Sequence, residues 1–149
     1  MIELIGNVEI VYWELAPNGN LVLQTQKTKN LVVDSGLNLI RDRLAGTSSL
    51  YPTHLAVGTG STAASAAQTT LVTEVFRDTL TSTTTASKAV TFKYYLASGS
   101  ANGNTIREIG LFTASSGGTM VARAMLASPI IKTSSVTATF TWTLNLSAT

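Results

Sequence analysis

Acidic and basic side chains that could take part in chemistry stand beside one another at three places in the chain. Glu108 follows Arg107, Glu74 and Asp78 flank Arg77, and Asp42 lies between Arg41 and Arg43. Two carboxylates on either side of a bound sugar could cleave a glycosidic bond. An acid within reach of an arginine has its pKa lowered and stays ionised, which does not suit a general acid. These clusters therefore favour ion pairs over catalysis.

Glu108 is the most informative of these acids because its strand is otherwise rich in Ile and Leu. This setting predicts a buried or interfacial ion pair with Arg77 or Arg123. Such a pair specifies geometry more than it adds stability. Glu108, Arg77 and Arg123 are thus candidates for a structural ion pair, and we expect no catalytic residue among them.

The other residue types that serve catalysis or metal binding are sparse. His54 is the one histidine and the chain has no cysteine, so a zinc site would need several carboxylates. No serine lies in a nucleophile-elbow pattern, which leaves a hydrolase triad without support. Gly58-Thr59-Gly60 lacks the residues that complete a phosphate-binding loop, so it predicts a plain turn. We expect no enzyme, no metal and no cofactor.

Two aromatic residues are candidates for contacts with other subunits. Most aromatic side chains of a β-sandwich lie in its core. Trp13 and Tyr95, however, fall on the less apolar faces of their predicted strands. An exposed aromatic platform would instead suit a carbohydrate-binding module, which remains a remote alternative.

Length and composition exclude several other classes of protein. The 149 residues predict one domain, 1–149, large enough to bury a core. The net charge is +2 and only 12% of residues are charged, so no basic patch for nucleic acid is expected. No apolar run approaches the roughly 18 residues that a membrane span needs. The N-terminus lacks the pattern of a signal peptide, so we expect a soluble chain that is not secreted by that route.

The elements that must position these residues are mostly strands. Strict alternation of apolar and polar residues predicts strands near 88–97 and 136–146, and the six apolar residues of the second fix its register. Residues 105–112 are apolar on both faces, which predicts a central strand. Gly110 inside that strand indicates a bulge or a close approach of another group. We expect the strands near 88–97 and 119–126 to pair with it.

The first third of the chain predicts a hairpin followed by a helix. Strands at 6–15 and 21–26 flank the turn sequence Pro17-Asn18-Gly19-Asn20. A helix is expected at about 36–45, with Asp34 or Ser35 as its cap.

The predicted buried face of this helix consists of Leu37, Ile40 and Leu44. Hydroxyl-rich segments at 61–70 and 81–87 predict surface loops. Together, roughly eight strands and one inserted short helix predict a mainly β fold, either an antiparallel β-sandwich or a jelly-roll-like barrel.

Four segments of the sequence resemble small structural proteins of tailed bacteriophages. They are Asn30–Arg41, Thr53–Gly60, Glu74–Arg77 and Ile106–Phe112. Within the last, Glu-Ile-Gly-Leu-Phe is similar to an element of phage tail-collar and tail-fibre proteins. The resemblance extends over about residues 6–146 and implies a non-enzymatic component of the virion, made in the bacterial host cytoplasm. It brings no catalytic residues with it.

The place in the virion is predicted from the chain's own features. A short chain without a shaft or repeats favours a capsid decoration (cement) protein, which would clamp neighbouring copies of the major capsid protein as a homotrimer. The loops at 61–70 and 81–87 would then lie on the capsid. The alternative is a short tail, collar, fibre or baseplate-associated protein, with tail or baseplate proteins as partners.

Overall fold

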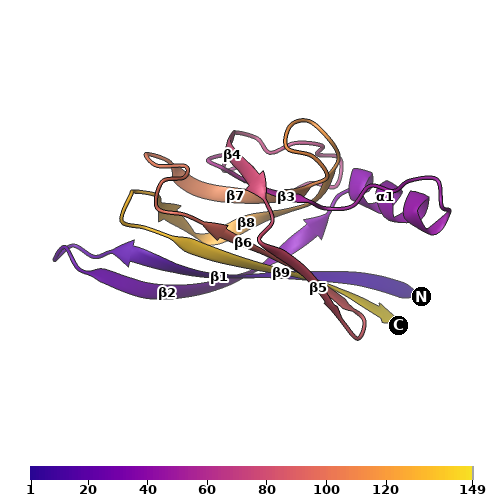
Figure 1. The fold of residues 1–149 in the computed structure, drawn as a ribbon, viewed down its shortest axis with the longest axis horizontal. Helices are drawn as coiled ribbons and strands as arrows, with labels where there is room; N and C mark the ends of the chain where they lie inside the picture. Colours follow the sequence, from indigo (N-terminus) through magenta and orange to yellow (C-terminus); the bar gives the residue numbers. More distant parts are fainter. Residues whose placement is uncertain (149) are drawn as a thin grey trace.

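The computed structural model describes residues 1–148, which form one curled antiparallel sheet and, within that range, one helix (Figure 1). The strands are β1 (Ile2–Leu15), β2 (Leu21–Val32), β3 (His54–Gly58), β4 (Glu74–Thr79), β5 (Ser82–Ala86), β6 (Ala89–Leu96), β7 (Thr105–Phe112), β8 (Met120–Ile131) and β9 (Ala138–Ala148). Their order across the sheet is β4-β3-β7-β8-β2-β1-β9-β6-β5. The mainly β, antiparallel fold with one short inserted helix predicted from the sequence is confirmed.

The longest hairpin joins β1 to β2 and has the predicted turn. Gly19 has a φ of 82°, a backbone conformation that favours glycine, and Leu15 pairs with Leu21 directly before and after the turn. Both strands run further than expected, because β1 begins at Ile2 and β2 continues to Val32. The turn therefore lies at the end of a long, projecting ribbon (Figure 1).

Strand β2 connects the two halves of the sheet. Its earlier residues pair with β1, whereas Asn30 to Val32 pair with β8. Where the backbones of β2 and β8 have separated, the Gln26 amide binds Ser128 through both its oxygen and its nitrogen, at 3.0 and 2.8 Å. The side chain thus replaces one step of the missing backbone pairing.

The core lies between the two facing halves of the curled sheet. Val8 and Ile10 of β1 and Phe140 and Trp142 of β9 are fully buried on one side, and apolar residues of β3, β7 and β8 cover them from the other. The alternation predicted for β9 is confirmed, except that the buried set ends at Leu144. Leu146, which the sequence pattern placed with that set, is exposed.

Strand β7 is central, as its two apolar faces predicted, but one of its neighbours differs from the expectation. It lies between β3 and β8, while β6 lies between β9 and β5. The strand near 88–97 therefore does not pair with it, because β6 buries one face only and suits the other half of the sheet. Gly110 marks a close approach, since a Cβ there would lie 3.0 Å from the side chain of Leu71.

The helix α1 (Asp34–Leu44) is present, but its cap and its buried face were predicted wrongly. Its N-cap is Val33, with no side-chain cap, and the Ser35 hydroxyl instead donates to the Met120 carbonyl. Gly36 and Leu39 are the buried residues. A Cβ at Gly36 would collide with the Val121 backbone, so the helix packs with its own backbone against β8 and turns Leu37 and Leu44 outward.

The hydroxyl-rich segment after β4 also differs from the prediction. Residues 82–86 form the edge strand β5, paired with β6, and not a loop. Its side chains are all exposed, so no apolar alternation marks it as a strand. The β-branched threonines favour an extended backbone nonetheless. The other predicted loop, 61–70, lies between β3 and β4 and contains no strand or helix.

Candidate functional site

Glu108 of β7 and Arg123 of β8 form an ion pair inside the protein. Arg123 donates from Nε and Nη2 to Oε2 of Glu108, at 3.0 and 2.7 Å. Neither side chain has any exposed surface. Because both charges are desolvated, each depends on the other for compensation.

The pair also anchors the long connection between β3 and β4. Glu108 accepts hydrogen bonds from the backbone N–H groups of Gly60, Val72 and Thr73, at 3.1, 3.0 and 2.7 Å. Arg123 donates to the Thr62 carbonyl at 2.8 Å and to the Gln68 side chain at 3.0 Å. Burial alone would raise the pKa of Glu108, but the Thr73 and Val72 amides and Arg123 together lower it. The arrangement holds a loop in place and leaves no proton for acid catalysis.

Glycine at position 60 allows the Glu108 carboxylate to come close to the loop backbone. A Cβ on Gly60 would lie 2.5 Å from Oε1 of Glu108 and 2.6 Å from Cβ of Val72. The glycines of Gly58-Thr59-Gly60 thus make room for a carboxylate that belongs to the same chain.

Arg77 is not a partner of Glu108 in the structure. It forms a bidentate salt bridge with the Glu74 carboxylate, at 2.9 and 2.7 Å, and its guanidinium lies 3.6 Å from the centre of the Phe112 ring. Its remaining nitrogen donates to the carbonyls of Ala114 and Gly117. Arg77 therefore fixes the turn after β7.

Lys132 is a buried cation that the sequence reasoning missed. Its Nζ donates to the Ser98 and Thr133 carbonyls and to Oδ1 of Asn102, at 3.2, 2.9 and 2.8 Å. Burial lowers its pKa. The available signal was its spacing of two from the buried Ile130. Among residues 1–148, no group of His, Asp and Glu side chains could hold a metal ion.

Trp13 and Tyr95 both lie exposed on the outer face of the sheet. They retain 41% and 50% of their accessible surface. They are not in one row, because Tyr95 aligns with Thr139 and Val11, while Trp13 lies further along β1 opposite Leu23. Trp13 instead belongs to a hairpin patch of exposed outer-face side chains. These are Trp13, Leu15, Leu21 and Leu23.

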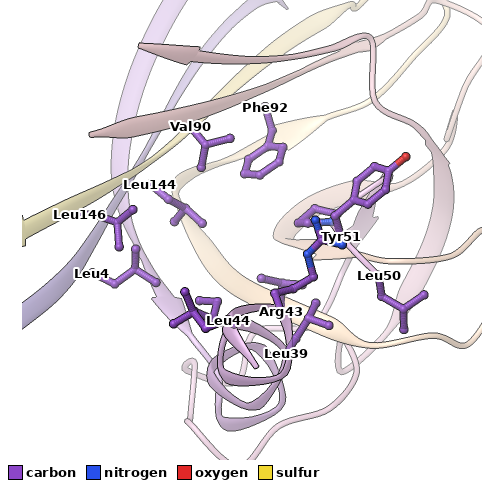
Figure 2. Close-up of a pocket in the computed structure, with 13 residues that line it drawn as sticks. Leu4, Leu39, Arg43, Leu44, Leu50, Tyr51, Val90, Phe92, Leu144 and Leu146 are labelled. Atoms are coloured by element: carbon purple, nitrogen blue, oxygen red, sulfur yellow. The ribbon is translucent and has the colours of Figure 1, made fainter. Parts of the chain in front are cut away.

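An apolar groove at the opposite end of the molecule was not anticipated from the sequence. It lies between α1 and the ends of β1, β6 and β9 and encloses about 300 Å³. Its walls include Leu4, Leu39, Leu44, Phe92, Leu144 and Leu146. Leu44 is 86% exposed at its edge, and Figure 2 shows Arg43 extending from α1 toward Tyr51 beside the apolar side chains.

Comparisons with known proteins place most of this sequence in one family. The family model for the N-terminal region of phage tail-collar fibre proteins matches residues 25–146. No curated protein and no solved structure matches the chain. Within the part of the chain that the structure describes, no helix is long and apolar enough to cross a membrane.

Proposed function

The chain belongs to the family defined by the N-terminal region of phage tail-collar fibre proteins, and we propose that it acts in the tail by binding other tail proteins. The family supports a structural, non-enzymatic protein of the phage tail, carried in the virion. It favours the tail, collar or fibre position over the capsid. The capsid decoration role expected from the sequence, with the major capsid protein as partner, is not supported and is withdrawn.

The apolar groove is the observation that carries this proposal. Exposed apolar side chains that gather around one groove, with a charged residue at its edge, are typical of protein contact sites. The groove is continuous with the exposed Leu44, Leu50 and Tyr51, so a partner could cover one contiguous region. The buried Glu108–Arg123 pair, by contrast, is already satisfied within the chain and offers nothing to a substrate.

We also propose contacts on the outer face of the sheet. Trp13 and Tyr95 are exposed, and aromatic side chains are enriched among the residues that dominate binding energy. Self-association would be symmetric and cyclic, and a homotrimer remains the proposed assembly. Tyr95 is offered as a contact for a different tail protein, because it lies two strands away from the hairpin patch.

The copy number of the protein in purified virions tests its position. We expect quantitative mass spectrometry to find far fewer copies than of the major capsid protein. A ratio near one to one would place the protein in the shell and overturn the proposal.

A phage carrying Leu44→Lys tests the groove. The substitution puts a charge at the edge of the groove, and we expect tails to lose most of this protein. Leu37→Lys is the matched control, since Leu37 is exposed on the same helix but does not line the groove. Equal incorporation of both variants would remove the groove from the proposal.

A further inference from the structure

We infer that the groove receives the β1–β2 hairpin of a second copy of this chain. The inference rests on the proposed binding function and names the partner of its groove.

The β1–β2 turn, beside which the hairpin patch lies, and α1, which forms one wall of the groove, are at opposite ends of the long axis of the molecule (Figure 1). The turn between β1 and β2 projects at one end, whereas α1 and both ends of the chain lie at the other. The hairpin cannot reach the groove of its own copy. It is free to reach the groove of another.

The two faces of the hairpin match the two walls of the groove. The outer face presents the hairpin patch, which is entirely apolar, and the sheet wall of the groove is apolar too, with Leu4, Phe92 and Leu144. The inner face near the turn carries Glu14 opposite the exposed Val22. The helix wall correspondingly carries Arg43 beside Leu44. In a ribbon inserted between the walls, the apolar hairpin patch would contact the apolar sheet wall. Glu14 and Val22 would contact the helix wall with Arg43 and Leu44.

The charges are complementary. Glu14 is exposed at the hairpin end, and Arg43 is exposed at the groove. Within residues 1–148, neither side chain has an ion-pair partner, whereas the neighbouring Arg41 is paired with Asp42. Insertion of the hairpin would bring the Glu14 carboxylate to the wall that carries the Arg43 guanidinium.

A contact between two different surfaces of the same chain is head-to-tail. Each copy uses its hairpin toward one neighbour and its groove toward the other, so the assembly closes into a ring or extends as a filament. A ring of three copies would be the homotrimer proposed above.

The test measures the mass of the purified chain by analytical ultracentrifugation over a range of concentrations. We expect wild type to assemble, and Leu15→Lys and Leu44→Lys each to be monomeric, because each removes one of the two surfaces from every copy. An equimolar mixture of these two variants should form a dimer and nothing larger, because the intact hairpin of Leu44→Lys can bind the intact groove of Leu15→Lys. Monomeric wild type, or a mixture that stays monomeric, would overturn the inference, as would assembly by either single variant.

Charge exchange and matched controls complete the experiment. Glu14→Arg alone should weaken assembly at least tenfold, and the double variant Glu14→Arg with Arg43→Glu should restore it. Ile5→Lys on β1 and Leu37→Lys on α1 change exposed residues outside both surfaces and should assemble like wild type. Circular dichroism checks that each variant is folded. If the purified chain is monomeric while Leu44→Lys still prevents incorporation into tails, the groove binds a different tail protein and only this inference fails.

Discussion

Glu108 and Arg123 face each other across paired strands with 2.7 Å between Oε2 and Nη2 and no exposed surface on either side chain. Three backbone amides complete the coordination of the carboxylate. The pair therefore couples the middle of the sheet to the loop that joins β3 to β4. We therefore expect its removal to destabilise both the sheet and this loop.

We expect Glu108→Gln to lower the free energy of unfolding by about 3–5 kcal/mol, because it leaves the Arg123 charge buried without compensation. Urea denaturation measures the change. Glu9→Gln is the control, since the same substitution there breaks an exposed pair with Lys27, which should cost about 0–1 kcal/mol. Equal midpoints for the two variants would show that the buried pair does not stabilise the fold.

The same pair predicts how stability depends on pH. The pKa of Glu108 in the folded protein lies below its ordinary value of 4.5. The unfolded chain then takes up the proton first as the pH falls, so the stabilisation is complete above that value and is lost as the pH falls toward the folded pKa. Calorimetry should find that the difference in Tm between wild type and Glu108→Gln narrows below about pH 4.5. A constant difference would contradict this assignment.

Gly60→Ala should destabilise the protein by about 1–3 kcal/mol, because the added methyl group must displace the Glu108 carboxylate or Val72. Gly99→Ala is the matched control, since a Cβ there would have no atom within 4 Å. It should leave stability unchanged or raise it by up to about 1 kcal/mol. Thermal unfolding of both variants decides whether the close approach at residue 60 is required.

Truncation of two neighbouring aromatic residues on β1 should affect different properties, self-association in one case and stability in the other. Trp13→Ala removes part of the exposed hairpin patch, so we expect weaker self-association in ultracentrifugation and a nearly unchanged urea midpoint. Tyr12→Ala removes a buried side chain from the other face and should cost about 3–5 kcal/mol of stability. An oligomer unaffected by Trp13→Ala would count against that residue as a subunit contact.

The features that could be predicted from the sequence are those encoded by neighbouring residues. The alternation in β9 fixed its register, and the turn residues around Gly19 specified the first hairpin. The two apolar faces of β7 indicated its central place. The resemblance, which includes residues 108–112, pointed to a phage structural protein, and the match at 25–146 shows that the chain belongs to the phage tail-collar fibre family.

The features that could not be predicted depend on long-range packing. The face that α1 buries is decided by the contact of Gly36 with the Val121 backbone, which local periodicity does not encode. The pairing of β7 with β3 joins segments about 50 residues apart in sequence and has no local signature. The groove is lined by residues of α1, β1, β6 and β9, which are far apart in the sequence, so no single segment of the sequence indicates it.

The pairing of β1 with β9 has a mechanical consequence. Ile2 lies opposite Ala148 and Tyr12 lies opposite Ala138, so the outer ends of both strands emerge together. A force that separates Ile2 from Ala148 would break the hydrogen bonds of this ladder one residue pair at a time. A pull between the hairpin and Ala148 would load the ladder in shear, with all its pairs resisting at once. The domain should therefore withstand force along its length far better than force that spreads its two ends.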